Sequence, residues 1–342
     1  MKKIKRPKKT KKYRNIKILL IFAILVLFSF VAWMTDYATA PLNLTASAQE
    51  VSIQSGSGLR SVALQLKEQG VIANEWPFIL LAKALHKESN LQAGEYHLNK
   101  NISPYYLLVS LIQGKTTQSS ITFIEGKTFN QMQQSIAAND ALKHTALNLS
   151  DVELMRKLGS DITHPEGLFF PDTYYFNRNV EDVTVLKRAY DTMQTKLESA
   201  WQARADNLPY KSSYEALIMA SIIEKETGQA SERKMIAGVF VNRLRIGMRL
   251  QTDPTVIYGM GEQYQGNIRR KDLLNDTAYN TYTRSGLPPT PIAMPSLASI
   301  EAALHPEDTR ALYFVGKGDG THVFSSSLVE HNRAVTQYQL KK

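Results

Sequence analysis

The 342-residue sequence contains no cysteine. This absence excludes a disulfide framework, a thiolate nucleophile and any metal site built on cysteine. The signatures of several enzyme classes are also missing, because there is no GxxxxGK[ST] or strand-linked GxGxxG nucleotide loop, no HExxH zinc helix and no GxSxG nucleophile elbow. The histidines are scattered along the chain. We therefore predict that the protein uses neither a metal nor a cofactor.

Acidic residues are absent from the first 17 positions, which hold ten lysines and arginines. The rest of the chain has 31 basic and 31 acidic residues, so the net charge of +10 belongs to this tail. A protein that binds nucleic acid through a folded surface concentrates basic residues on that surface. The distribution of charge therefore argues against nucleic acid as a partner.

A long apolar run follows the tail. Residues 16–34, IKILLIFAILVLFSFVAWM, contain Lys17 as their only charged residue, and a membrane helix needs about 20 apolar residues. A basic flank stays in the cytoplasm, so we predict a cytoplasmic tail at 1–15, a transmembrane helix at 16–34 and an extracytoplasmic remainder. The alternative is a cleaved signal peptide with ATA at 38–40 as its cleavage site, although the apolar region of such a peptide is usually only about 7–15 residues long.

The segment after the apolar run has the pattern of a linker followed by a small module. Residues 35–49 are mostly small and polar, which is typical of a linker. The module at 50–118 is predicted to have the order β-α-α-β, with a strand at 50–56, helices at 58–70 and 75–85, and a strand at 93–98. A further helix is predicted to end at Gly114.

The remainder is predicted to comprise a mixed region and a mainly helical domain, which makes the fold class α+β. The intermediate region at 119–205 opens with a strand and a helix and continues into an extended aromatic segment at 165–176, so it loosely repeats the preceding module. The domain at 206–342 has helical periodicity and closes with a hairpin around the Asp-Gly turn at 319–320.

One predicted helix, 213–227, is apolar on nearly all sides, which indicates burial, and it ends with two glutamates in the stretch MASIIEKETG. Glu224 and Glu226 are two residues apart and point in nearly opposite directions, so they cannot share a site. Apolar surroundings and the negative end of a helix both raise the pKa of a carboxyl, and a glutamic acid still protonated near neutral pH can act as a general acid. The alternative is a structural glutamate paired with an arginine, for which Arg233, Arg243 and Arg245 are available.

Two further segments carry groups that can work on a sugar. Asp253 lies before Pro254 and is predicted to be a helix N-cap. A catalytic role is the alternative for Asp253. The proline-rich loop at 278–296 holds Asn280 and Tyr282, whose amide and ring can hydrogen-bond and stack on sugars, and loops are where such groups usually act. The alternative for this loop is a rigid connector.

Four blocks in order, MASIIEKETG, RLRIGMRLQTDPTVIYGMG, AYNTYTRSGLPP and LYFVGKGDGTHVFS, resemble the YceG-like endolytic murein transglycosylases. The resemblance covers roughly residues 50–340 and implies a single-pass inner-membrane protein with a periplasmic catalytic domain. It also implies that the module at 50–118 is LysM-like and that 206–342 is a lytic-transglycosylase-like domain. The expected partners are peptidoglycan glycan strands, the lipid bilayer and peptidoglycan synthases.

The resemblance also assigns roles to residues. The catalytic acid of related enzymes is a glutamate followed by a hydroxyl residue, which here is Glu226 before Thr227, and Glu224 becomes a supporting acid. Asp253, Asn280 and Tyr282 are expected to support catalysis or to bind substrate. The implied activity is that of a lyase that cuts the MurNAc-GlcNAc bond within nascent strands, leaves a 1,6-anhydro end and limits chain length. A membrane-tethered glycan-binding scaffold and a hydrolytic muramidase using Glu226 with Asp253 are the alternatives.

Overall fold

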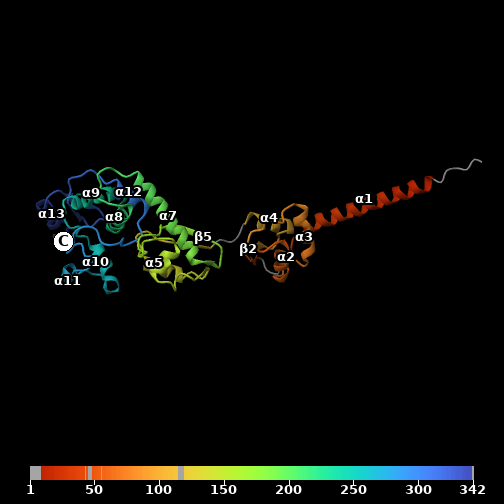
Figure 1. The fold of residues 1–342 in the computed structure, drawn as a ribbon, viewed down its shortest axis with the longest axis horizontal. Coiled ribbons are helices and arrows are strands. Elements are labelled where there is room, and N and C mark those ends of the chain that lie inside the picture. The colour runs from red at the N-terminus through yellow and green to blue at the C-terminus, as the bar shows by residue number, and fades with distance from the viewer. Residues whose placement is uncertain (1–8, 43, 45–47, 55, 115–118, 341–342) are drawn as a thin grey trace, which may run out of the picture. The chain divides into compact units, whose positions relative to one another are not determined.

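The computed structural model describes residues 9–42, 44, 48–54, 56–114 and 119–340 (Figure 1). The chain is a mixed α/β protein and divides into two compact units, Met1–Ser119 and Ser120–Lys342. Each unit has its own hydrophobic core. The sequence analysis separated 119–205 from 206–342, but one core contains residues from both ranges, for example Leu197 and Leu217.

The first unit contains strands and helices in the predicted order β-α-α-β. Its elements are β1 (Ala48–Ile53), α2 (Leu59–Glu68), α3 (Glu75–Ala84), β2 (Gly94–Asn99) and α4 (Pro104–Gln113). The two strands pair antiparallel, with Val51 opposite Tyr96. The buried face of α2 consists of the residues at helical spacing in the sequence, Leu59, Val62, Ala63 and Leu66. Helix α4 ends at Gly114, which takes the left-handed conformation common after helices.

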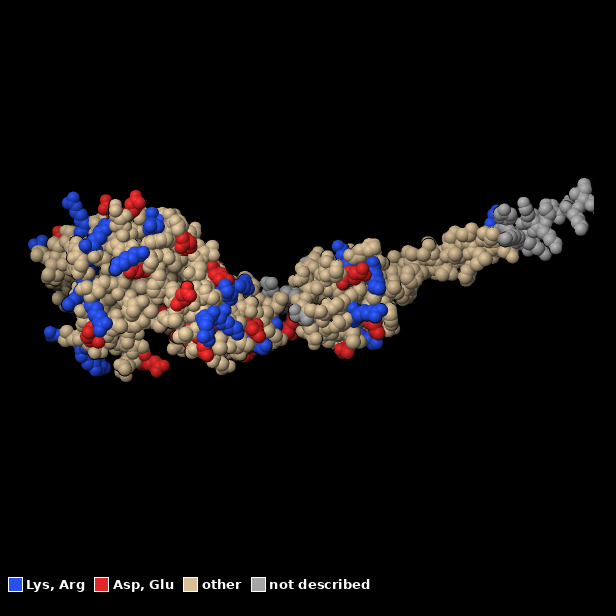
Figure 2. Space-filling view, in the orientation of Figure 1, with Lys and Arg blue, Asp and Glu red and all other residues tan. Residues whose placement is uncertain are grey.

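Helix α1 (Lys9–Thr39) continues beyond the predicted end of the apolar segment at residue 34. Its stretch Asn15–Thr39 is long and apolar enough to cross a membrane, although a signal sequence has the same properties. Figure 2 shows this stretch as a nearly uncharged surface. The predicted linker at 35–49 begins inside the helix, because Tyr37 and Ala38 pack against the core of the first unit. This packing outweighs the weak helix propensity of the local sequence.

The second unit opens with short elements around one predicted helix. They are β3 (Ser119–Thr122), α5 (Phe129–Ala137), β4 (Leu142–Lys143), α6 (Asp151–Lys157), β5 (Thr173–Phe176) and β6 (Val180–Glu181). Strand β3 pairs with β5, and β4 pairs with β6. The order β3-α5-α6-β5, with β3 paired to β5, matches the order β1-α2-α3-β2 of the first unit, whereas the pair β4–β6 has no counterpart among the described elements of that unit. The two units are therefore loosely alike, as the sequence predicted.

The aromatic segment predicted as extended at 165–176 is a strand only at its end, in β5. The chain turns at Gly167, where φ is +77° and an added Cβ would lie 2.3 Å from the Cβ of Pro291. Only glycine fits such a position without strain. The turn places Glu166 inside the protein, with 3% of its surface exposed.

Helices dominate the rest of the second unit. They are α7 (Asp182–Gln202), α8 (Ser213–Glu226), α9 (Arg233–Arg245), α10 (Asp253–Met260), α11 (Arg270–Leu274), α12 (Leu297–Leu304) and α13 (Leu328–Val335), with 3₁₀ turns at Ala230–Glu232 and Gly261–Gln263 and a π-helical turn at Thr336–Leu340. Strands β7 (Tyr313–Gly316) and β8 (His322–Ser325) form the predicted antiparallel hairpin. The sequence analysis missed α6 and α11, which have seven and five residues.

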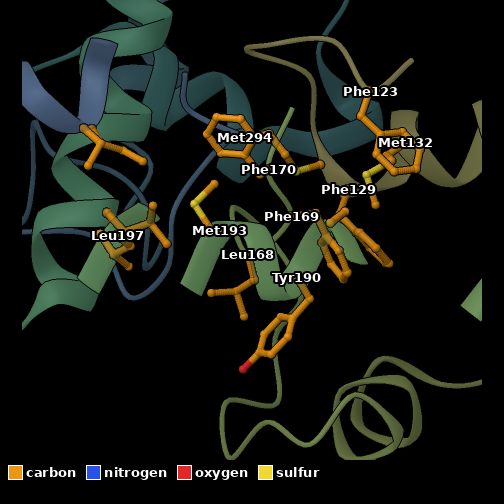
Figure 3. Close-up of a cluster of buried hydrophobic side chains, with 14 of the residues drawn as sticks. Phe123, Phe129, Met132, Leu168, Phe169, Phe170, Tyr190, Met193, Leu197 and Met294 are labelled. Atoms are coloured by element: carbon orange, nitrogen blue, oxygen red, sulfur yellow. The ribbon is translucent and has the colours of Figure 1, made fainter. Parts of the chain in front are cut away.

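Helix α8 lies at the centre of the second unit and contacts α7, α9, α10 and α12. Every residue from Ala216 to Ile223 is buried. Figure 3 shows another part of the same core, where the rings of Phe129 and Phe169 stack with their centroids 5.2 Å apart. After Ile223 the C-terminal turn of α8 reaches solvent, and it carries both glutamates.

Candidate active site

A cleft of about 470 Å³ lies at the C-terminal end of α8. Its walls come from α8, α9, the start of α10, the hairpin β7–β8 and the last helical turns of the chain. The lining residues are Glu226, Arg243, Gln251, Asp253, Tyr282, Tyr313, Phe314, Val315, Gly316, His322, Leu328, His331, Val335 and Gln339. The cleft therefore brings together three of the predicted site residues, Glu226, Asp253 and Tyr282, from three segments of the second unit.

Glu226 is half-buried, lines the cleft and is the last residue of α8. Burial raises the pKa of its carboxyl, and the negative charge of Asp253 adds to this effect. A hydrogen bond from the Thr252 hydroxyl to Oε1, together with the positive charges of His322 and Arg243, acts in the opposite direction. Because burial is the largest contribution, the pKa lies above its usual range, as a general acid requires.

The hydroxyl that contacts Glu226 belongs to Thr252, which is held in place by two other buried threonines, Thr255 and Thr281. The main-chain N–H of Thr252 donates to Oγ1 of Thr281 at 3.0 Å, and Oγ1 of Thr255 lies 2.9 Å from the same oxygen. The first of these bonds uses the main chain of Thr252, and its side-chain hydroxyl donates to Glu226. Residues 252 and 281 are far apart in sequence, so the folded loop and α10 together set the orientation of the acid.

The buried Arg243 of α9 forms the wall beside Glu226. Its Nε and Nη1 donate to the carbonyl oxygens of Leu312 and Leu250, each at 2.6 Å, and desolvation lowers its pKa. The sequence analysis offered Arg243 as a partner for a structural glutamate, but the described ion pairs do not include a pair between Arg243 and Glu226. The arginine acts on Glu226 through its charge.

Glu224 lies on another side of the helix and has a structural contact. Its Oε2 accepts hydrogen bonds from the main-chain N–H of Ser296 at 2.9 Å and from the hydroxyl of Ser296 at 2.5 Å. Ser296 is the N-cap of α12, so Glu224 joins the ends of two packed helices. Glu224 does not line the cleft that contains Glu226.

Asp253 and Tyr282 form a pair at the mouth of the cleft. The Tyr282 hydroxyl donates to Oδ1 of Asp253 at 2.6 Å, and burial followed by this contact raises the pKa of Tyr282. The prediction that Asp253 caps α10 was wrong by one residue, because Thr252 is the N-cap and Asp253 is the first helical residue. Proline then occupies the second helical position, and the Thr252 hydroxyl contacts Glu226 instead of capping the helix.

Asn280 is 1% exposed and lies away from the cleft. Its Nδ2 is 2.7–3.3 Å from the carbonyl oxygens of Asp272, Leu273 and Asn275, and its Oδ1 accepts the N–H of Tyr282 at 2.9 Å. These contacts occupy the amide, so the structure does not support the predicted substrate contact. Within the loop at 278–296, Tyr282 lines the cleft, whereas residues 290–296 are buried.

Sequence reasoning missed several residues of the cleft. His322 is held by Glu232, with Nδ1 2.7 Å from Oε2, and the ring of His331 stacks on Tyr313 at 5.2 Å. Desolvation and the charge of Arg243 lower the pKa of His331. The signals available in the sequence were weak, because single histidines and threonines outside a spaced motif do not reveal which distant residues they meet.

The family model described as the YceG-like family matches residues 51–337 of the chain. The chain belongs to the YceG-like family. The match spans most of both compact units, including every residue named for the cleft except Gln339.

Named relatives and a solved structure agree with membership of the YceG-like family. The endolytic murein transglycosylase of Bacillus subtilis (strain 168) is 36% identical over 310 residues, which is 84% of each chain. That of Streptococcus pneumoniae (strain D39) is 27% identical, and the match covers 84% of this chain but 58% of the relative. A crystal structure of a yceG-like protein from Listeria monocytogenes matches with a TM-score of 0.56 and 32% identity, over 84% of this chain and 98% of that one.

Proposed function

We propose that the protein is an endolytic lytic transglycosylase that cuts glycan strands of peptidoglycan. The observation that carries this proposal is the position of Glu226, a carboxyl with a raised pKa in the wall of a cleft. The names of the relatives from Bacillus and Streptococcus support the same activity. Cutting within nascent strands between MurNAc and GlcNAc would limit their length.

Glu226 is proposed to act first as an acid and then as a base. As an acid it donates its proton to the oxygen that leaves C1 of N-acetylmuramic acid, and the substrate's acetamido group stabilises the positive charge at C1. The resulting carboxylate is stabilised by the Thr252 hydroxyl and by the charge of Arg243. It then takes the proton of the C6 hydroxyl, whose oxygen bonds to C1 and closes the 1,6-anhydro ring.

This sequence of steps uses one carboxyl, whereas most glycoside hydrolases use two. The C6 hydroxyl belongs to the sugar being cut, so it reacts at a high effective concentration and no water is consumed. The carboxylate of Asp253 accepts the Tyr282 hydroxyl, and its negative charge helps to keep Glu226 protonated. Asp253 and Tyr282 are therefore proposed as supporting residues at the cleft mouth.

Product analysis distinguishes this function from its alternatives. Purified protein is incubated with peptidoglycan sacculi, and the released fragments are analysed by mass spectrometry. The proposal requires fragments with 1,6-anhydro ends, which are lighter by one water than reducing ends. Reducing ends alone would identify a hydrolytic muramidase in which Asp253 activates water, and the absence of cleavage would identify a glycan-binding scaffold.

Replacing Thr252 with valine is expected to lower activity roughly 10- to 150-fold, because a hydrogen bond to a charged group is worth roughly 1.5–3 kcal/mol. Valine keeps the shape of threonine but cannot donate to Glu226. Since that bond lowers the pKa of Glu226, its loss should also move the alkaline limb of the pH–rate profile to higher pH. Thr252→Ser is the matched control and should retain the profile. An unchanged profile in Thr252→Val would contradict the assigned contact.

The first unit is proposed to bind and orient the substrate. Its β-α-α-β order and the match of the family model support a LysM-like module, which would bind glycan weakly. The lytic-transglycosylase-like domain would then be the mainly helical part of the second unit. Peptidoglycan synthases are proposed as partners because they make the nascent strands.

The protein is proposed to be anchored by α1 in the inner membrane, with its N-terminal tail in the cytoplasm and residues 35–342 outside it. The basic tail and the apolar stretch Asn15–Thr39 support this orientation. A reporter enzyme that is active only in the periplasm should work when it is fused after residue 342. Activity at that position from a reporter that works only in the cytoplasm would overturn the orientation, and release of the chain from membranes would indicate a cleaved signal sequence.

A further inference from the structure

Glu166 is a buried carboxyl that the proposed mechanism does not use. It lies between α6 and β5 and is 3% exposed. Its two oxygens accept the main-chain N–H of Phe129, the first residue of α5, at 3.0 and 3.1 Å. Its Oε2 also accepts the hydroxyl of Tyr258 at 3.1 Å. The carboxyl therefore joins the start of α5 to α10.

Helix α10 is the element that connects this buried contact to the cleft. Tyr258 lies near its C-terminal end, and its ring packs edge-on against Tyr279 with the centroids 4.9 Å apart. The N-cap of the same helix is Thr252, which donates to Glu226. Because a helix of eight residues moves as a rigid body, a contact at Tyr258 restrains the position of Thr252.

We propose that Glu166 is a positioning residue, which holds α10 through Tyr258 so that Thr252 stays in hydrogen-bond contact with Glu226. This inference rests on the proposed function, since its effect is read out in the activity of Glu226. Glu166 acts through two other residues and is not itself in the cleft.

The groups around Glu166 suit its ionised form. The donors are the N–H groups of Phe129 and Gly167 and the Tyr258 hydroxyl, and the nearby titratable groups are Asp151 of α6 and Tyr214 of α8. His164 uses its Nδ1 to accept the N–H of Glu166. None of the described contacts or charges of Glu166 involves a lysine or arginine. Three hydrogen atoms, from these two N–H groups and the hydroxyl, already point at the carboxyl. A proton on the carboxyl itself would be a fourth, so one of the three contacts must weaken.

The consequence is an acid limb in the pH dependence of activity. Burial raises the pKa of Glu166 to about 7, so the carboxyl takes up a proton as the pH falls through this value. The hydrogen bond to Tyr258 then loses its charge, and charged hydrogen bonds are about twice as strong as neutral ones. We expect kcat to fall roughly fivefold from pH 8 to pH 5.5, while the alkaline limb is set by Glu226.

The test compares pH–kcat profiles of the full-length protein and two variants on peptidoglycan sacculi, with anhydro-ended fragments as the readout. Glu166→Gln keeps hydrogen bonding but does not titrate, so it should lose the acid limb near pH 7 and keep the alkaline limb. Tyr258→Phe removes the link at every pH, so it should reduce kcat about fivefold at pH 8 with an unchanged KM and also lack the acid limb.

The outcomes separate this inference from the proposed function. Anhydro products from the unaltered protein, combined with a normal acid limb in Glu166→Gln, would overturn the role of Glu166 alone. A normal profile in Tyr258→Phe would do the same if Glu166→Gln failed to fold. The absence of anhydro products from the unaltered protein would instead reject the proposed function.

Discussion

Replacing Glu226 with glutamine is expected to abolish the formation of anhydro ends, with a loss of at least about 10²–10⁴-fold, the usual contribution of general acid–base catalysis. Glutamine has nearly the same size and can still accept the hydroxyl of Thr252, but it can neither donate a proton to the leaving oxygen nor accept one from C6. The variant should fold and bind peptidoglycan. The measurement is the yield of anhydro-ended fragments beside thermal unfolding and sedimentation with sacculi.

Glu224→Gln is the matched control, because it makes the same chemical change two residues away. Glu224 accepts two hydrogen bonds from Ser296 at the start of α12, so its loss of charge should cost about 1 kcal/mol of stability and leave most of the activity. If Glu224→Gln were inactive and Glu226→Gln active, the two roles would be reversed. Activity in both variants would reject the cleft at the end of α8 as the catalytic site.

The stability of the second unit is expected to decrease between about pH 4.5 and pH 7 because of Glu166. Burial raises the pKa of this carboxyl from 4.5 to about 7. In that interval the unfolded chain has lost the proton that the folded protein still holds, so the free energy of unfolding falls as the pH rises and levels off above pH 7. A shift of this size corresponds to about 3 kcal/mol.

Comparing the protein with Glu166→Gln isolates this contribution from those of other groups. The difference in unfolding free energy between the two proteins should change by about 3 kcal/mol from pH 4.5 to pH 8, in favour of the variant at high pH. Urea unfolding is followed by the fluorescence of Trp201, the one tryptophan of the second unit. A difference that stays constant with pH would show that Glu166 is ionised throughout and that its pKa is not raised.

Local patterns in the sequence were sufficient to locate most helices and to draw attention to the pair Glu224 and Glu226. The spacing of apolar residues predicted α2, α7 and α8, because the side chains that these helices bury recur along the sequence itself. The apolar helix predicted a buried segment that ends in two carboxylates, and only the resemblance to related enzymes, through the hydroxyl residue Thr227, favoured Glu226 over Glu224. Helices α6 and α11 were missed because they are too short to show a periodic pattern of apolar residues. Helix α6 begins instead with a local capping box between Ser150 and Glu153.

Contacts between distant segments were not predictable from one sequence. Thr252 meets Glu226 across 26 residues, and Tyr258 meets Glu166 across 92 residues. The capping position of α10 was misjudged for the same reason, since Thr252 and Asp253 are both good N-cap residues and the distant Glu226 takes the Thr252 hydroxyl. Asn280 has a side chain suited to a sugar, but its own loop uses every group that it offers.

Helix α1 has no break, so its apolar stretch Asn15–Thr39 is rigidly connected to the core of the first unit. A flexible tether would let the module tumble, but Tyr37 and Ala38 clamp the end of the helix to the core of the unit. In a membrane-anchored chain, each residue added to α1 before Tyr37 would turn the module by about 100° around the helix axis and lift it by about 1.5 Å. In such a chain the length of this helix would therefore set the height and the orientation of the module relative to the lipid surface.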